Sequence, residues 1–244
     1  MKTIINSLTH KIDKQLDNNL KRDDSPLPKG TRGLIWIISG RKGTGKTSLV
    51  LNVLSQKVKD GGYKKYFDNI WFISPTAAMD DKANKLVNEL KEDNKYYKHL
   101  DVSIIDEIEA QILAYNEENI KKEPRNLLIL DDCICELPPR LGKSVLNKLV
   151  VLARHYKLSI WFLVQKYNSL NTLIRSNADL ISFFKTDNEK EYKTIEDDVF
   201  INNNLFRDIY EYATDSGPNS FMHINLLSNP PTFYKKFDKI ILDG

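Results

Sequence analysis

The sequence has few of the residues that build disulfide-rich, zinc-binding or membrane-spanning proteins. It contains two cysteines in 244 residues, Cys133 and Cys135, which are too few for a disulfide framework or a zinc site. We expect both to be small buried residues of an intracellular protein. No apolar run approaches the roughly 18 residues of a membrane helix, and polar residues interrupt the N-terminal stretch too often for a signal peptide. We therefore expect no membrane segment.

The sequence also lacks a strong excess of either charge. Lysine and arginine number 36 against 33 acidic residues, which gives a formal net charge of +3. This mild balance is compatible with nucleic-acid binding but gives no argument for it. The four histidines are scattered without the spacing of a metal site. The composition, 41% hydrophobic and 28% charged, is ordinary for a globular protein of one α/β domain with an appendage.

A phosphate-binding motif stands out in residues 34–50, LIWIISGRKGTGKTSLV. An apolar strand pattern precedes the glycines and a helix pattern follows them, which is the context that predicts a P-loop. Its backbone N–H groups would cradle the β- and γ-phosphates at the positive end of the helix. We expect Lys46 to reach the terminal phosphates and Thr47 to bind Mg²⁺. The nucleotide-binding residues are predicted to be Gly40, Arg41, Lys42, Gly43, Thr44, Gly45, Lys46, Thr47 and Ser48.

The rest of the chain alternates apolar segments with helical patterns. Buried strands are predicted at 69–75, 127–130, 159–164 and 180–184, with a marginal one at 102–105. Helices are predicted at 46–60, 79–98 and 188–213, among others. Short apolar strands separated by helices imply an α/β fold whose mainly parallel sheet is covered on both faces. Such a sheet binds ligands beyond the carboxyl ends of its strands.

Both ends of the chain add to this core. Residues 1–28 predict a short amphipathic helical arm followed by a charged, proline-containing linker, which leaves 29–244 as the nucleotide-binding domain. We favour packing of the arm on its own domain over docking on a neighbour. Strand-like pieces at 221–227 and 232–237, separated by Ser-Asn-Pro-Pro, predict a β-hairpin at a sheet edge.

The stretch LLILDD supplies the second half of a nucleotide site. We assign Asp131, the first acid beyond the buried strand, to Mg²⁺ through water, and Asp132 to orienting the attacking water and accepting its proton. Gln165 ends the next strand, where its amide can sense the γ-phosphate and hydrogen-bond the attacking water, or simply close the strand. The sequence separation of loop and acids suits a fold with another strand between them. Small nucleoside kinases often lack that strand and use a mobile lid rich in arginine, and the sequence shows no such lid.

Basic residues near these motifs have two interpretations each. Arg154 precedes the strand that ends in Gln165, and it is either a surface residue or one presented to a neighbouring subunit, where arginine stabilises transferred phosphoryl charge. Arg175 is the next candidate for that role. A basic turn after Pro138-Pro139 either contacts DNA phosphates or is merely exposed; it holds Arg140, Lys143 and Lys148.

Four segments occur in the order seen in poxvirus-type genome-packaging ATPases of the FtsK/HerA superfamily, which are found in large DNA viruses and virophages: ISGRKGTGKTSL, LLILDDC, ARHYKLSIWFLVQ and LIRSNADLISFF. The chain resembles this family over residues 33–200. The resemblance implies a RecA-like P-loop core, ATP and Mg²⁺ as cofactors, a homo-oligomeric ring and ATP-driven translocation of double-stranded DNA into a capsid. It also implies capsid or portal-vertex partners and a place in the host cytoplasm or the virion.

The resemblance also assigns roles by position. Lys46 and Thr47 match the Walker A residues, Asp131 and Asp132 the Walker B acids, Gln165 the polar sensor, and Arg154 the arginine before the sensor strand. Many superfamily members have glutamate where Asp132 stands, so Glu136 is the second candidate for the catalytic acid.

Two alternatives remain open from the sequence. One is another DNA-translocating or coupling P-loop ATPase, and the other is a scaffold that binds ATP with little turnover. Stimulation of ATP hydrolysis by DNA separates a motor from a scaffold.

Overall fold

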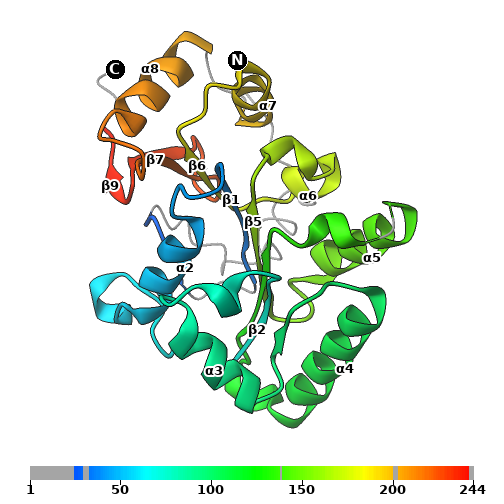
Figure 1. The fold of residues 1–244 in the computed structure, drawn as a ribbon. Helices are drawn as coiled ribbons and strands as arrows, with labels where there is room; N and C mark the ends of the chain where they lie inside the picture. The colour runs from blue at the N-terminus through cyan, green and yellow to red at the C-terminus, as the bar shows by residue number, and fades with distance from the viewer. Residues whose placement is uncertain (1–24, 30–32, 138, 200–202, 242–244) are drawn as a thin grey trace, which may run out of the picture.

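The computed structural model describes residues 25–29, 33–137, 139–199 and 203–241. Of the helical arm and linker expected at 1–28, residues 1–24 lie outside these ranges. The described residues form one sheet of nine strands in the order β3-β2-β4-β5-β1-β6-β7-β8-β9, with helices on both sides (Figure 1). Among the helices of these ranges, none has the length and apolar character needed to span a bilayer.

The sheet is parallel from β3 to β6 and antiparallel from β6 to β9. The parallel strands are β1 (Ile35–Ser39), β2 (Asn69–Ile73), β3 (Tyr96–Tyr97), β4 (Asn126–Asp131), β5 (Leu158–Val164) and β6 (Leu180–Phe184). The antiparallel strands are β7 (Phe221–Asn225), β8 (Thr232–Lys235) and β9 (Asp238–Lys239). The predicted fold class and C-terminal hairpin are confirmed, although the short β9, not the hairpin itself, forms that edge.

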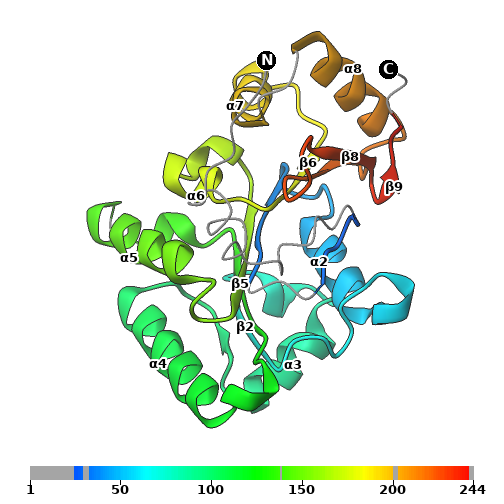
Figure 2. The same ribbon diagram turned by 180° about the vertical axis from the view of Figure 1, so that it is seen from behind.

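Seven helices within the described ranges cover the sheet: α2 (Lys46–Ser55), α3 (Asn84–Glu92), α4 (Val102–Glu118), α5 (Pro139–Leu152), α6 (Thr172–Ser176), α7 (Glu189–Val199) and α8 (Asn203–Thr214). Successive strand residues point to opposite faces. Ile35 and Ile37 of β1 therefore pack with α4 to α8, whereas Trp36 and Ile38 pack with α2 and α3. Figures 1 and 2 show these two helical layers from opposite sides. Burial on both faces explains why the parallel strands read as unbroken apolar runs.

Strand β5 lies between β1, which leads into the phosphate loop, and β4, which ends in the acidic pair. Residue by residue, β5 pairs with β1 on one side and β4 on the other. This is the intervening strand predicted from the spacing of the motifs. Since all these strands are parallel, their carboxyl ends meet at one edge of the sheet.

The strand predicted at 102–105 is wrong, because these residues are the first turn of α4. Asp101 ends the preceding extended segment, and its carboxylate accepts the backbone N–H of Ile104 at 3.0 Å. Such a cap satisfies one of the free N–H groups of a helix start. Ile105, Ile108 and Ile112 then face the core at helical spacing.

Two helices are shorter than predicted. The helix predicted at 79–98 is α3, Asn84–Glu92, because Asn94 adopts φ +54° and the chain then forms the edge strand β3. The helix predicted at 46–60 ends at Ser55, because Gln56 is extended, and a separate 3-10 turn follows at Val58–Asp60. In both cases the helical pattern continues past a residue whose backbone leaves the helix.

The described part of the N-terminal segment, residues 25–29, lies against the sheet. Leu27 is buried in the α2/α3 layer. The fully buried His223 of β7 donates from Nε2 to the carbonyl of Pro26 at 2.6 Å, and its Nδ1 accepts from Ser182. Ser182 accepts in turn from the Trp36 indole N–H. A chain of hydrogen bonds thus links residues 25–29 to the strand that carries the phosphate loop.

Candidate nucleotide-binding site

The phosphate loop connects β1 to α2 at the carboxyl edge of the sheet. Gly40 leaves the strand where its N–H bonds Val164 of β5. A Cβ at Gly40 would lie 2.7 Å from Thr44 Oγ1 and 2.8 Å from Phe184 Cβ, so a larger residue does not fit. Gly45, immediately before α2, adopts φ +101°, a left-handed conformation that favours glycine. These constraints produce the compact loop that the glycine spacing predicted.

Lys46 is the first residue of α2, and its side chain folds back into the loop. The residue is 5% exposed, and its Nζ donates to the carbonyls of Gly40 at 2.8 Å and Arg41 at 3.4 Å. The same Nζ lies 3.6 Å from Asp132 Oδ2. The ammonium group is therefore held inside the loop, where it can exchange backbone carbonyls for an anionic ligand.

Asp131 ends β4 and is buried under the loop. Its Oδ2 accepts from Ser74 at 3.0 Å and lies 3.5 Å from Thr47 Oγ1. Burial raises the pKa of the Asp131 carboxyl to about 6, and the charge of Asp132 acts in the same direction, whereas Ser74, Lys46 and Thr47 lower it. A nearby cation favours the ionised form of such a carboxyl.

Ser74 is a site residue that the sequence analysis missed. It follows β2, the strand next to β4, and its Oγ accepts the N–H of Ala77 at 3.0 Å while donating to Asp131. The signal available in the sequence was a small polar residue directly after an apolar strand and before Pro75. The hydroxyls of Ser74 and Thr47 both lie against the Asp131 carboxylate. Oxygen ligands of this kind are those that Mg²⁺ prefers.

Asp132 points across the mouth of the loop. Its backbone adopts φ +50°, a left-handed conformation that aspartate tolerates better than most residues. Its Oδ2 accepts from Gln165 Nε2 at 3.1 Å in addition to facing Lys46. Glu136, the second candidate for the catalytic acid, instead accepts the N–H of Leu100 at 2.7 Å. Five predicted residues thus meet at one edge: Lys46, Thr47, Asp131, Asp132 and Gln165.

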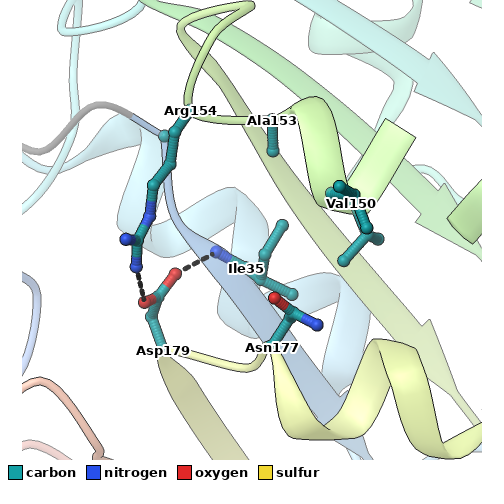
Figure 3. Close-up of a pocket in the computed structure, with 8 residues that line it drawn as sticks. Ile35, Val150, Ala153, Arg154, Asn177 and Asp179 are labelled. Atoms are coloured by element: carbon teal, nitrogen blue, oxygen red, sulfur yellow. Dashed lines mark hydrogen bonds and ion pairs between the residues drawn. The ribbon is translucent and has the colours of Figure 1, made fainter. Parts of the chain in front are cut away.

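Arg154 lies at the opposite, amino edge of the sheet, so the structure does not bring it to the phosphate loop of its own chain. Its side chain is 64% exposed and its Nη2 lies 3.7 Å from Asp179 Oδ1. Figure 3 shows the two side chains directed at each other, with the other Asp179 oxygen accepting the N–H of Ile35 at 2.8 Å. Burial raises the pKa of Asp179 to about 6, against the effects of Ile35 and Arg154. Together with apolar side chains they line a pocket of about 180 Å³.

The remaining basic candidates differ in their surroundings. Arg175 has a 14% exposed side chain and is bound to Asp198 at 2.9 Å. Arg140 is exposed on the first turn of α5. Lys148 instead bonds both carboxylate oxygens of Glu109, at 2.6 and 2.8 Å. The Lys143 side chain lies outside the described part of the structure.

Two residues of the phosphate loop lie on its outer side, and the two cysteines differ in their burial. Arg41 and Lys42 are exposed, and Arg41 Nη1 pairs with Asp187 at 3.1 Å, a contact between the phosphate loop and the segment after β6. Cys133 is buried as expected. Cys135 is exposed, which corrects that expectation, because it lies on the 3-10 turn Ile134–Glu136 beyond the strand.

One protein family and several solved structures are similar to this chain. A family model described as the poxvirus A32 protein matches residues 32–197. No curated protein sequence matches the chain. Among solved structures, the genome packaging NTPase B204 of Sulfolobus turreted icosahedral virus 2 in complex with AMP is 17% identical, covers 87% of this chain and 100% of its own, and has a TM-score of 0.55.

A second solved structure, B204 of Sulfolobus turreted icosahedral virus, is described as a DNA-packaging ATPase. It is 18% identical, covers 84% of this chain and 97% of its own, and has a TM-score of 0.56. The virus 2 protein in complex with ATP-gammaS gives 17% identity, coverage of 85% and 99%, and a TM-score of 0.53. At these identities the similarity shows a shared fold.

Proposed function

Because the chain belongs to the poxvirus A32 protein family, we propose that it is a viral genome-packaging ATPase that couples ATP hydrolysis to the movement of double-stranded DNA. The resemblance inferred from the motifs of residues 33–200 is thereby confirmed. The observation that carries the proposal is the meeting of Lys46, Thr47, Asp131, Asp132 and Gln165 at one edge of the sheet.

In this proposal the phosphate loop binds the triphosphate of ATP. Its backbone N–H groups and the start of α2 attract the phosphates, and Lys46 exchanges the carbonyls of Gly40 and Arg41 for phosphate oxygens. Thr47 and Asp131 would hold Mg²⁺, whose charge offsets that of the phosphates. Ser74 keeps the Asp131 carboxylate oriented.

Hydrolysis is assigned to Asp132 and Gln165. The Asp132 carboxylate accepts the proton of the attacking water. The amide of Gln165, which is already bonded to that carboxylate, orients the same water. Glu136 is less suited to this role because its carboxylate caps the N–H of Leu100. Lys46 stabilises the negative charge that develops on the terminal phosphate.

Arg154 is proposed to act on the ATP of a neighbouring subunit in a ring. It precedes β5, and a seven-residue strand is about 20 Å long, so Arg154 cannot reach the loop at the other end of its own sheet. Its exposure leaves it open to a second copy of the chain. In a packaging role, the partners of the chain would be capsid or portal-vertex proteins. Its location would be the host cytoplasm or the virion.

The decisive experiment measures the ATPase rate with and without double-stranded DNA while light scattering follows assembly. A motor hydrolyses ATP faster on DNA and does so as an oligomer. ATP binding with little turnover, unchanged by DNA, would instead identify a nucleotide-dependent scaffold.

A further inference from the structure

We propose that Glu191 is a positioning residue for Gln165. Its buried carboxylate, near the start of α7, fixes residues 165–169, the sensor turn that follows β5, and so sets where the Gln165 amide meets Asp132. This inference rests on the proposed ATPase function, since it concerns the residue that orients the attacking water.

The contact itself is short and buried. Glu191 is 4% exposed and Tyr167 is 0% exposed. Glu191 Oε2 accepts the backbone N–H of Tyr167 at 2.5 Å. Tyr167 opens the 3-10 turn Tyr167–Ser169, two residues after Gln165. A buried backbone N–H needs a partner, and hydrogen bonds to ionised acceptors are the shorter and stronger ones.

The strand alone leaves Gln165 weakly fixed. The last residue of β5 is Val164, whose carbonyl accepts the N–H of Gly40. Gln165 lies beyond this ladder and is exposed. Glu191 provides the next anchor along the chain at Tyr167. The backbone that carries Gln165 is thus held on one side by the phosphate loop and on the other by α7.

Structural stability alone is a poor reason for this carboxylate. Glu191 Oε1 is buried and makes no hydrogen bond to any described residue. A buried carboxylate with one unpaired oxygen loses its hydration without full compensation. A buried polar atom left unpaired in a folded protein calls for an explanation, and fixing the sensor turn supplies one.

The start of α7 is rigid enough to act as an anchor. Asn188 Oδ1 accepts the N–H groups of Lys190 at 3.0 Å and Glu191 at 3.4 Å, which caps the helix. One residue before this cap, Asp187 pairs with Arg41 of the phosphate loop at 3.1 Å. The β6–α7 connection, residues 185–188, therefore joins the loop that binds phosphate to the turn that carries the sensor.

The test compares three variants of the full chain under DNA-stimulated conditions. Glu191→Ala removes the acceptor, whereas Glu191→Gln keeps an oxygen for the Tyr167 N–H and loses the charge. Glu196→Ala is the matched control, because Glu196 is a buried carboxylate of the same helix that bonds Lys193 and Tyr192, away from the sensor turn. Steady-state kinetics give kcat and KM for ATP, and hydrogen exchange reports the Tyr167 amide.

For Glu191→Ala we expect kcat to fall about 10- to 100-fold with little change in KM, since small misplacements of catalytic groups cost rates of that order. Its Tyr167 amide should exchange faster. Glu191→Gln should retain most of the rate and the protection, and Glu196→Ala should lower the melting temperature without lowering kcat. If Glu191→Ala does not fold, Glu191→Asp is the second variant. Its side chain is one methylene shorter, so the carboxylate lies farther from the Tyr167 N–H, and kcat should fall in the same way but less.

A wild-type kcat in a folded Glu191→Ala or Glu191→Asp protein would overturn the inference, as would a Glu191→Gln protein as slow as Glu191→Ala. In each of these results the wild-type protein still hydrolyses ATP, so the proposed function stands. Absence of wild-type hydrolysis would overturn the proposed function and this inference with it.

Discussion

Lys46 and Asp132 face each other across the mouth of the phosphate loop, with Nζ and Oδ2 3.6 Å apart. They come from α2 and from the residue after β4, two segments that lie far apart in the sequence. Gln165 joins them through the same Asp132 oxygen. A cation, a carboxylate and an amide are thus arranged around one point, and each can be removed separately.

Replacing Lys46 by alanine should abolish tight ATP binding or turnover while leaving the fold intact. Lys46 is 5% exposed, and its ammonium group bonds the loop carbonyls of Gly40 and Arg41 and faces Asp132, so its loss removes the main cation at the phosphates. Nucleotide titration, ATPase rate and circular dichroism check this. Lys42→Ala is the control, because Lys42 is exposed and would contribute its backbone N–H. Normal hydrolysis by folded Lys46→Ala would exclude Lys46 from the mechanism.

Asp132→Asn should bind Mg-ATP but hydrolyse it about 10²–10⁴-fold more slowly, the usual range for loss of a general base. The amide keeps the size of the side chain but accepts no proton. Glu136→Gln should hydrolyse at a near-normal rate, because glutamine can still accept the Leu100 N–H. Single-turnover hydrolysis and nucleotide binding are measured for both variants. The reverse result, with Glu136→Gln crippled and Asp132→Asn normal, would reassign the catalytic acid to Glu136.

DNA binding should show no sequence preference and should weaken steeply with salt. A pump passes every sequence, so it should contact phosphates and leave base edges unread. Arg140→Ala should reduce the slope of log K against log salt by about 1. Lys121→Ala, an exposed lysine just before β4 at the opposite edge, should leave the slope unchanged. Strong preference for one short sequence, persisting at high salt, would indicate a regulator instead.

Unfolding free energy should fall as pH drops from about 6.5 towards 4, partly through His223. Burial lowers the His223 pKa to about 4, below the roughly 6.5 of an unfolded histidine. The unfolded chain therefore binds a proton first, and this part of the stability, present above pH 6.5, is lost by up to about 1.4 kcal/mol per pH unit. Protonation also adds a donor at Nδ1, which now accepts from Ser182.

Urea unfolding at pH 7 and pH 5 tests the role of His223. The wild-type protein should lose more stability between these values than His223→Gln, which cannot titrate there. His155→Gln, at an exposed position, should behave like the wild type. Equal losses in the wild type and His223→Gln would show that His223 does not carry the effect.

Local sequence motifs predicted most of the candidate site. Contacts between strands could not be predicted, because they depend on how the sheet pairs. The glycine spacing dictates the backbone of the phosphate loop, and the acids after β4 lie where any parallel strand would place them. Ser74 could not be assigned, because its role depends on β2 pairing with β4. Glu191 likewise acts through the packing of α7 on the sensor turn. The strand predicted at 102–105 was avoidable, since Asp101 is a typical N-cap residue.

Arg154→Ala should bind ATP yet hardly turn over. A ring motor must link each hydrolysis step to the position of its neighbour. An arginine that completes the charge stabilisation only when the interface closes provides this link. Such arginines are worth about 10³–10⁵ in rate where measured in GTPases. ATP binding and hydrolysis are measured on assembled protein. The Arg154 side chain is 64% exposed and its Nη2 lies 3.7 Å from the buried Asp179 Oδ1, a long contact that leaves the guanidinium open to a phosphate from a neighbour.

Mixing Arg154→Ala with Lys46→Ala should restore part of the activity, since neither protein alone holds a complete site. In a mixed ring, an intact phosphate loop of one subunit can meet an intact arginine of the next. Homogeneous rings of either variant are the controls. No recovery despite proven co-assembly would count against a role between subunits, and full activity of Arg154→Ala alone would exclude it. Arg175 would be a poor replacement, because its guanidinium is mostly buried against Asp198 and the Leu170 carbonyl. Of these two arginines, the more exposed Arg154 is therefore the one we propose for a neighbour's site.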